Sequence, residues 1–397
     1  MELSSKAKKI SPSLTLAITA KAKELKAKGV DIVSFGAGEP DFDTPENIQE
    51  AGIKAIKAGL TRYTAASGIV ELKAAITEKF QKDNNLTYKK SQIIVSTGAK
   101  QCLANAFQAI LNPGEEVIIP GAYWVSYPEL IQLADGVPVI VETKEENEFK
   151  YNIDELKAAI NDKTKAILVN SPNNPTGTVY GKEDLEKIAE IAKEHDLVII
   201  SDEIYEKLLY GEEKHVSIAS LSEDAYNRTI VINGVSKAYA MTGWRIGYAA
   251  ASEEITKLMT SLQSHVTSNP NSVAQYAALE ALTGDQNDVA NMVKAFEKRR
   301  DFMVETVNQI DSVSCIKPKG AFYVMVNISE TFGKSINGKV INTSMEFAEA
   351  ILEEEKVAVI PGIAFGMEGY IRLSYATSME LIKEGLKRLE NFIKKMQ

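Results

Sequence analysis

Four short polar motifs follow apolar, strand-like runs of the sequence, and their residue types could support covalent and anion-binding chemistry. They are TGAKQ at residues 97–101, SPNNPTG at 171–177, DEIY at 202–205 and NGVSK at 233–237. They offer, in turn, a small-residue turn, asparagines, an aspartate with a tyrosine, and a lysine. Ligands of open α/β sheets bind beyond the carboxyl ends of the strands, so we expect one pocket to receive all four motifs.

The first motif would place Gly98, Ala99 and Lys100 at the start of a helix, where backbone N–H groups and the helix dipole attract an anion. Many ordinary βα turns have the same composition, so the motif by itself fits a plain turn equally well. Lys100 is the unusual member, because a cation in the first helical turn opposes the dipole. It either faces water or meets an anion.

Asp202 ends the apolar run LVIISD, so its carboxylate loses its hydration unless it meets a cation or several hydrogen-bond donors. It could simply cap a helix. Alternatively, it could hold a protonated ring nitrogen of a ligand. Tyr205, three residues further on, could reach the same ligand.

Lys237 and Arg245 are the only charged residues of the segment GVSKAYAMTGWRIGY, residues 234–248. A lysine among small and apolar residues is desolvated, which lowers its pKa and makes it a nucleophile or a former of Schiff bases. A surface lysine that keeps its ammonium group in water is the alternative. Arg245 is a fixed cation suited to a phosphate dianion.

Arg372 lies in the apolar run GYIRLSYAT, where the alternation of a strand puts it on the same face as Tyr370 and Ser374. An arginine in such a strand needs an anionic partner, and a carboxylate fits the planar guanidinium through two hydrogen bonds. A substrate carboxylate and a structural ion pair with an aspartate or glutamate would satisfy it equally well.

The elements that position these residues alternate between strand and helix. Between about residues 90 and 250, short β-rich runs alternate with amphipathic stretches, which predicts βαβ units and a mostly parallel sheet with helices on both faces. We predict strands at residues 93–96, 116–119, 137–141, 166–169, 197–201, 229–232 and 246–250, and helices at residues 100–111, 125–134, 154–160 and 182–195.

The C-terminal part is typical of a smaller α+β domain, to which residues 10–29 would also belong. We predict helices at residues 252–263, 287–309, 344–354 and 378–395, and strands at residues 321–327, 358–360 and 370–375. The predicted fold class is therefore α/β, with a large cofactor-binding domain over residues 45–290 and a small domain made of residues 1–44 and 291–397.

The composition disfavours several classes of protein. The 397 residues include 45 Lys and Arg against 54 Asp and Glu, and the net charge of −9 argues against nucleic acid as a partner. The two cysteines, Cys102 and Cys315, have neither zinc-binding nor disulfide-framework spacing, so we expect reduced thiols and no metal site. No apolar run suits a signal peptide or a membrane span, so we expect a cytoplasmic protein.

Residues 234–247 resemble the lysine signature of the class-I pyridoxal-phosphate aminotransferases. The matching positions are Gly234, Ser236, Lys237, Gly243, Arg245 and Gly247. The motifs SPNNPTG and SDEIY and the late Arg372 also match that family, in its order. GEPDFDTP at residues 38–45, RYTAASG at 62–68 and GAYWVSY at 121–127 extend the resemblance over nearly the whole chain. The most similar subgroup is the bacterial aspartate aminotransferases whose anion-binding turn carries a lysine.

The resemblance implies fold type I of the pyridoxal-phosphate enzymes, with a mostly parallel seven-stranded sheet in the large domain. It implies that Lys237 is the Schiff-base lysine and proton shuttle, and that Asp202 pairs with the pyridinium nitrogen. Tyr205 and Asn174 would hydrogen-bond the phenolic oxygen, and Trp124 would stack on the ring. The remaining cofactor-binding residues would be Ser236 and, around the phosphate, Gly98, Ala99, Lys100, Arg245 and Tyr63 from the other subunit.

The α-carboxylate of the substrate would bind Arg372, Asn174 and the backbone at Gly38, with Trp124 and Lys100 as further substrate contacts. Because Tyr63 would act across a subunit boundary, the resemblance implies a homodimer. The implied reaction moves the amino group of aspartate, or of a related amino acid, to 2-oxoglutarate in a ping-pong cycle on pyridoxal 5'-phosphate. An aminotransferase of broader, aromatic or neutral specificity and a pyridoxal-phosphate-dependent β-C–S lyase are the alternatives.

Lys100 favours dicarboxylic substrates, since Arg245 and backbone amides already serve the phosphate. Prephenate-accepting members of the subgroup have a basic residue near position 11, and Ser11 argues against prephenate here. A nicotinamide dehydrogenase would need G-x-G-x-x-G after its first strand, and Asp41 stands where the third glycine would be. A DNA-binding regulator built on this fold would need an extra basic module, for which we find no residues left over.

Overall fold

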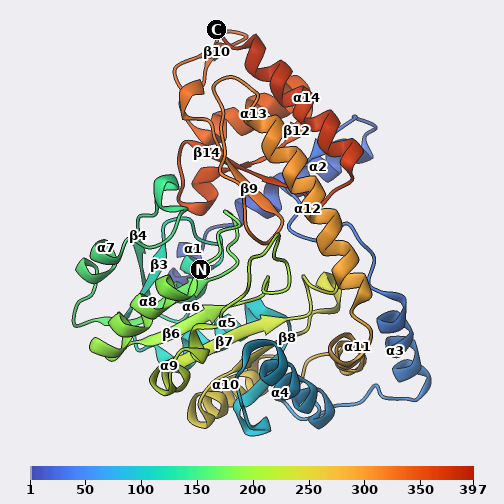
Figure 1. Cartoon of the computed structure of the whole chain (residues 1–397), viewed down its shortest axis with the longest axis vertical. Coiled ribbons are helices and arrows are strands. Elements are labelled where there is room, and N and C mark those ends of the chain that lie inside the picture. Colours follow the sequence, from blue (N-terminus) through green and yellow to red (C-terminus); the bar gives the residue numbers. More distant parts are fainter. Residues whose placement is uncertain (1) are drawn as a thin grey trace.

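The computed structural model describes residues 2–397 and contains a central sheet of seven strands in the order β2-β8-β7-β6-β5-β3-β4 (Figure 1). Neighbouring strands are parallel, except that β8 runs antiparallel to both β2 and β7. The predicted α/β fold with a mostly parallel seven-stranded sheet is therefore confirmed. The strands are β2 (Ile93–Ser96), β3 (Glu116–Pro120), β4 (Val137–Val141), β5 (Thr164–Asn170), β6 (Val198–Asp202), β7 (Thr229–Gly234) and β8 (Gly247–Ala250).

Helices cover both faces of this sheet, as its continuous apolar strands require. One face packs against α5, α6 and α10, with Phe107 and Tyr127 fully buried between them. The opposite face packs against α4, α7, α8, α9 and α11. The helices of this part are α3 (Glu46–Lys57), α4 (Val70–Asn84), α5 (Ala99–Ile110), α6 (Tyr127–Leu133), α7 (Ile153–Ala158), α8 (Lys182–Glu194), α9 (Glu223–Arg228), α10 (Glu253–Val266) and α11 (Ser272–Thr283).

A second core forms where N-terminal and C-terminal elements meet, around an antiparallel sheet of order β13-β14-β9 and a parallel pair β1-β12. Phe296, Phe322, Phe347 and Phe392 are fully buried in it. Its helices are α2 (Leu14–Ala27), α12 (Asn287–Val307), α13 (Ser344–Glu355) and α14 (Met379–Lys395), whereas the short helix α1 (Ser5–Lys9) has no buried residue and lies outside this core. Its strands are β1 (Val33–Ser34), β9 (Tyr323–Asn327), β10 (Ser335–Ile336), β11 (Lys339–Val340), β12 (Val357–Ala358), β13 (Ile360–Pro361) and β14 (Tyr370–Ser374).

Residues 358–360, predicted as one strand, belong to two strands. Ala358 ends β12, which pairs with β1, whereas Ile360 begins β13 and lies opposite Arg372 of β14. The chain changes sheets at Val359, so an apolar run that is continuous in sequence is divided in space. The prediction of a single strand was wrong because periodicity within one run does not reveal which neighbour each residue pairs with.

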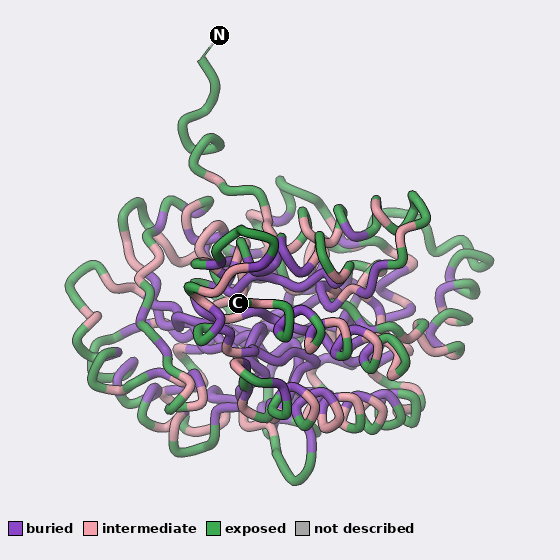
Figure 2. Tube along the Cα trace, turned by 90° about the horizontal axis from the view of Figure 1, so that it is seen from above, coloured by how far each residue is buried: buried purple, intermediate pink, exposed green. Residues whose placement is uncertain are grey.

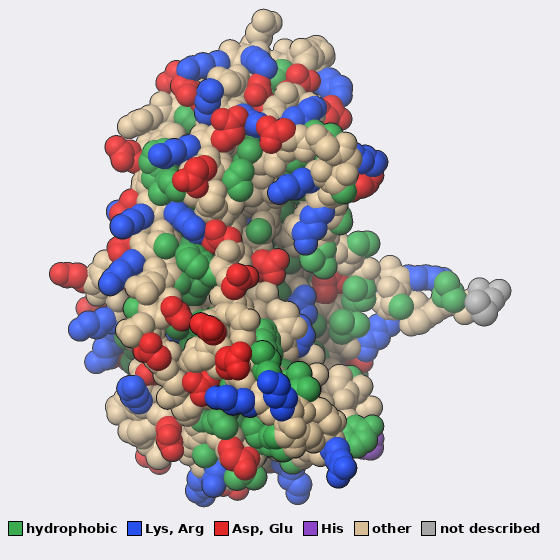
Figure 3. Space-filling view, turned by 90° about the vertical axis from the view of Figure 1, so that its right-hand side faces the viewer, with side chains coloured by type: hydrophobic (Ala, Val, Ile, Leu, Met, Phe, Trp, Pro, Cys, Tyr) green, Lys and Arg blue, Asp and Glu red, His purple; other side chains and the backbone are tan. Residues whose placement is uncertain are grey.

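The surface is polar and of mixed charge. Acidic and basic side chains are interspersed over the face shown in Figure 3. The N-terminal segment projects from the body of the molecule with its residues largely exposed (Figure 2), and Lys6 pairs with Asp135 at 3.0 Å. None of the helices within residues 2–397 is long and apolar enough to cross a membrane.

Candidate active site

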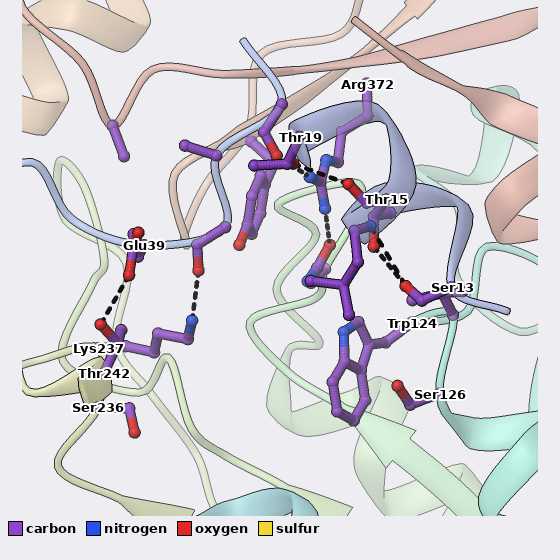
Figure 4. Close-up of a pocket in the computed structure, with 18 of the residues that line it drawn as sticks. Ser13, Thr15, Thr19, Glu39, Trp124, Ser126, Ser236, Lys237, Thr242 and Arg372 are labelled. Atoms are coloured by element: carbon purple, nitrogen blue, oxygen red, sulfur yellow. Dashed lines mark hydrogen bonds between the residues drawn. The ribbon is translucent and has the colours of Figure 1, made fainter. Parts of the chain in front are cut away.

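A cavity of about 620 Å³ lies where the carboxyl ends of β5, β6 and β7 meet α2, the start of α5 and β14 (Figure 4). Residues from all four polar motifs line it, together with others singled out from the sequence. The predicted residues found there are Gly38, Ala99, Lys100, Trp124, Asn174, Asp202, Tyr205, Ser236, Lys237, Arg245 and Arg372. The structure therefore brings nearly all of the predicted site residues together, from parts of the chain more than 300 positions apart.

Asp202 ends β6 and is buried at 4% exposure. The Tyr127 hydroxyl donates a hydrogen bond to its Oδ2 at 2.7 Å, and the Ile204 N–H donates to its Oδ1 at 3.3 Å. No helix follows β6 directly, so Asp202 does not cap one. Burial raises the pKa of Asp202 to about 6. A cationic ligand group beside this carboxylate would offset the loss of its hydration.

The turn after β6 directs its residues into two environments. Asp202 and Tyr205 line the cavity, whereas Glu203 and Glu206 belong to a buried charged cluster. The bases of that cluster are His215, whose Nε2 lies 2.9 Å from Glu203, and Lys79, which pairs with Glu206. The charges of both glutamates are compensated by these bases. The ion pairs anchor the turn on the side away from the cavity, which leaves Asp202 and Tyr205 directed into the cavity.

Lys237 follows β7, and its Nζ donates a hydrogen bond to the carbonyl oxygen of Gly38 at 2.5 Å (Figure 4). The Nζ also lies 5.8 Å from the ring centres of Tyr205 and Phe322. Burial lowers the pKa of Lys237 to about 8. The amine therefore changes its charge close to neutral pH, as a group that accepts and returns a proton must.

Arg372 is 3% exposed and lacks an anionic partner among the described residues. Its Nη1 donates to Asn174 Oδ1 at 3.0 Å and its Nη2 to the Gly36 carbonyl at 3.2 Å, while Nε has no hydrogen-bond partner. Its guanidinium lies 4.3 Å from the ring centre of Tyr323 and 4.9 Å from that of Phe365. The alternative of a structural ion pair is thus wrong within residues 2–397, and the guanidinium charge is available to an anion in the cavity.

The start of α5 and Arg245 form a second positive region. Gly98 precedes the helix with φ +82°, and a Cβ at this position would collide with the Arg245 guanidinium. Arg245 Nη1 donates to the Thr242 carbonyl at 2.8 Å. The first turn of α5 contains no acidic side chain to neutralise its N–H groups. The arrangement suits an anion such as a phosphate.

Lys100 lies beside the aromatic wall of the cavity, with its Nζ 4.8 Å from the ring centre of Trp124. Partial desolvation by the cavity wall lowers the pKa of Lys100, and the neighbouring Arg245 lowers it further. No carboxylate within residues 2–397 pairs with its ammonium group. Trp124 is itself held edge-on by Tyr127, with ring centres 5.4 Å apart. Lys100 is therefore a solvent-exposed cation at the wall of the cavity, without an anionic partner among the described residues.

Three residues around the site were not predicted. Tyr127 binds Asp202, Asn170 accepts the backbone N–H of Asn174 at 3.0 Å, and the Tyr323 hydroxyl lies 3.0 Å from that of Tyr205. Tyr127 belongs to the GAYWVSY motif and Asn170 directly precedes SPNNPTG, so their positions gave a signal. No sequence motif pointed to Tyr323, because its contact with Tyr205 joins residues 118 positions apart.

Tyr63 is one of two predicted site residues that do not line the cavity. It lies between α3 and α4 and is 90% exposed. Gly98 also does not line the cavity but stands directly behind Arg245. Within a single chain, Tyr63 contributes nothing to this site.

These residues fit the cofactor that the sequence resemblance implies. The start of α5 with Arg245 suits a phosphate, Lys237 offers an amine, and Asp202 offers a buried carboxylate that lacks a cation. The unpartnered Nε of Arg372 leaves a further position for an anionic substrate group. A phosphate, an electrophilic carbon and a basic ring nitrogen on one ligand would match the first three features.

Comparison with known proteins supports the same assignment. Residues 30–389 match the family described as aminotransferase class I and II. The chain is 52% identical over 395 residues to the aspartate aminotransferase of Bacillus subtilis, with 100% of both proteins covered. The crystal structure of the Rhizobium meliloti aspartate aminotransferase covers 100% of both chains, with a TM-score of 0.96 and 42% identity. The Thermus thermophilus aspartate aminotransferase with maleate covers 99% of this chain and 100% of its own, with a TM-score of 0.93 and 44% identity.

Proposed function

Because the chain belongs to the class I and II aminotransferases, which use pyridoxal 5'-phosphate, we propose that it moves the amino group of aspartate to 2-oxoglutarate. One observation carries the choice of substrate. Two cations, the buried Arg372 and the exposed Lys100, line one cavity, and neither has an anionic partner within residues 2–397. A dicarboxylic amino acid brings one carboxylate for each of them.

The cofactor would be held at three points by side chains of this chain. The N–H groups at the start of α5 and Arg245 would bind its phosphate, and Asp202 would pair with its ring nitrogen. Asn174 and Tyr205 would hydrogen-bond its phenolic oxygen, and the edge-held Trp124 would stack on its ring. When bound and protonated at the ring nitrogen, pyridoxal phosphate acts as an electron sink for the bonds at the substrate α-carbon.

Lys237 would hold the cofactor through its Nζ and then carry the proton of the transfer. A pKa of about 8 lets Nζ accept a proton and give it back near neutral pH. The Gly38 carbonyl 2.5 Å away keeps the amine directed into the cavity. Gly38 would also offer its backbone to the substrate α-carboxylate, alongside Arg372 and Asn174.

The two carboxylates of the substrate would be divided between the two cations. The Arg372 guanidinium lies close to the rings of Tyr323 and Phe365, and its Nη1 is fixed by Asn174, so it would present a preformed fork to the α-carboxylate. Lys100 would take the distal carboxylate. The Thermus thermophilus relative has been described with maleate, which is itself a four-carbon dicarboxylate.

The Lys100→Ala variant tests the assignment of the distal carboxylate. A charge-assisted contact of this kind contributes roughly 1.5–3 kcal/mol, so kcat/KM for aspartate should fall about 10–150-fold. The kcat/KM for alanine or phenylalanine should change little, since neither carries a second carboxylate. Steady-state rates over the three donors, with Lys100→Arg as the charge-preserving control, provide the measurement. If Lys100 instead supports the phosphate, the loss will be equal for acidic and neutral donors.

We also propose that the working unit is a homodimer in which Tyr63 of each chain completes the site of the other. Tyr63 is 90% exposed, although large aromatic side chains usually lose most of their exposure on folding. Ile53 and Ile56 of α3, Val70 of α4 and Leu60 in the connection between these helices are also exposed. An exposed aromatic residue among apolar neighbours is typical of an interface anchor.

Mixing two inactive variants tests this assembly. Dimers that combine a Lys237→Ala chain with a Tyr63→Ala chain contain one site with both residues intact. A refolded equimolar mixture should therefore regain about a quarter of the wild-type sites, assuming random pairing of the chains. Activity of the mixture, compared with each variant refolded alone, is the measurement. A wild-type chain that is fully active as a monomer in sedimentation would rule out the shared site.

Two expectations from the sequence remain proposals. A cytoplasmic location is compatible with the lack of a membrane-spanning helix within residues 2–397. Rejection of prephenate rests on Ser11, whose N–H donates to Glu129 at 3.3 Å.

A further inference from the structure

The loop that carries Tyr63 is held by buried side chains rather than left to move freely. It covers the RYTAASG motif at residues 62–68 and continues to Ile69, ahead of α4. Its tip is exposed, whereas Gly68 and Ile69 at its base are buried. Tyr63 does not reach the cavity of its own chain, so that cavity does not explain why the loop carrying this exposed tyrosine is anchored by buried residues.

Two glutamines with no exposed surface, Gln263 of α10 and Gln275 of α11, reach this loop. Gln275 Oε1 accepts the Ile69 N–H at 2.8 Å, and its Nε2 donates to Thr64 Oγ1 at 3.2 Å and to the Pro270 carbonyl at 2.9 Å. The amide group of this one side chain thus contacts the loop at two points, Thr64 and Ile69, which both follow Tyr63 in the chain.

Gln263 holds the middle of the loop. Its Nε2 donates to the Ala66 carbonyl at 2.6 Å and to the Val95 carbonyl at 2.7 Å. Its Oε1 accepts from Ser96 at 2.5 Å and from Asn105 at 2.9 Å. All four hydrogen-bonding positions of this buried amide are therefore used, which ties the loop to β2 and α5.

We propose that Gln263 and Gln275 are positioning residues for the site of the partner subunit, which they affect through Tyr63. The inference rests on the homodimer proposed above. The two buried amides restrain the loop directly after Tyr63, at Thr64, Ala66 and Ile69, so the Tyr63 side chain is presented in one direction before the partner binds. The conformational entropy of the loop is then already lost in the single chain. Binding of Tyr63 to the cofactor phosphate in the partner site therefore requires no further ordering of the loop.

Hybrid dimers can test this, because the same substitutions can be distributed in two ways. In the first hybrid, a chain with Lys237→Ala and Gln275→Met pairs with a wild-type chain. The only competent site then receives its Tyr63 from the altered loop. In the second hybrid, a Lys237→Ala chain pairs with a Gln275→Met chain, and the competent site receives Tyr63 from an unaltered loop. Differential affinity tags isolate each hybrid.

The reference is a hybrid of a Lys237→Ala chain with a wild-type chain, which lacks Gln275→Met. We expect the first hybrid to bind pyridoxal phosphate roughly tenfold more weakly than this reference at its competent site, and the second hybrid to bind it equally well. Cofactor affinity is read from the restoration of activity in titrations of the cofactor-free dimers. Hydrogen exchange of residues 62–69 in the cofactor-free protein is a second readout, and it should be faster in Gln275→Met because the Ile69 N–H loses its acceptor.

Two further variants separate positioning from general damage to the fold. Thr64→Val removes the acceptor of the Gln275 bond, together with the hydroxyl's 3.3 Å bond to the Ala65 carbonyl, and it should reproduce the weaker binding of the first hybrid in a milder form. Gln286→Met removes a similar set of bonds away from the loop, those donated to the Ala281 and Gly284 carbonyls and the one accepted from Tyr239, and it should leave cofactor affinity unchanged. Equal affinities in the two hybrids, with an active wild-type dimer, would overturn this inference alone. A wild-type chain that is inactive or monomeric would instead overturn the proposed function.

Discussion

Replacing Lys237 by alanine is expected to abolish amino transfer while the protein stays folded. The Nζ of Lys237 is the group in the cavity whose pKa, about 8, suits proton transfer near neutral pH. Loss of a positioned proton carrier lowers kcat by about 10²–10⁴-fold, and loss of the covalent link to the cofactor adds to this. The variant should also fail to retain cofactor after borohydride reduction, whereas the wild-type chain should retain it.

Lys150→Ala provides a matched control for Lys237→Ala. Lys150 is also a largely buried lysine with bonded partners, Glu148 at 2.9 Å and Asp184 at 3.0 Å, but it lies outside the cavity. Its loss should change stability more than activity. Near-normal kcat in Lys237→Ala, with circular dichroism like that of the wild type, would show that the assignment of the reaction is wrong.

The sequence was most informative where local composition and burial agree. The strands β2 and β5–β8 are short runs of apolar, often β-branched residues, and their predicted positions differ from the observed ones by two residues at most. The polar residues after these strands were expected to meet because parallel strands present their carboxyl ends on one edge. The structure places Asn174, Asp202 and Lys237 in one cavity as expected, while their chemical roles stay predictions.

Contacts between distant parts of the chain were beyond the reach of sequence patterns. Tyr127 and Asp202 are 75 positions apart, and no periodicity links a hydroxyl on α6 to a carboxylate at the end of β6. Helix α11 was not predicted either, since its sequence SVAQYAALEALT is rich in alanine and has no clear polar face. Buried Gln275 illustrates the same limit, because its hydrogen bond to Ile69 joins it to a distant loop and no pattern within its own helix indicates that contact.

Asp202→Asn is expected to lower kcat by about 10²–10³-fold, because it removes the negative charge opposite the proposed position of the ring nitrogen. Asparagine keeps the shape of the side chain and can still bond to Tyr127 and to the Ile204 N–H. The loss should therefore come from charge and not from a collapsed site. Activity with saturating cofactor separates this effect from weaker cofactor binding.

The same variant should be more stable than the wild type when no cofactor is present, and the difference should depend on pH. Burial raises the pKa of Asp202 from 3.8 to about 6 in the folded chain, so the folded state holds a proton that the unfolded state has lost between these values. This contribution to stability is complete below pH 3.8 and is lost as pH rises through 6, a change on the order of 3 kcal/mol.

Asparagine does not titrate, so the advantage of Asp202→Asn in urea unfolding should be small near pH 4 and largest above pH 7. Added pyridoxal phosphate should reverse the order, since a cation beside Asp202 compensates the buried carboxylate only in the wild type. Urea midpoints at both pH values, with and without cofactor, provide the measurement. A variant that is less stable than the wild type at pH 8 without cofactor would show that the carboxylate is already compensated, and its role as partner of a ring cation would be lost.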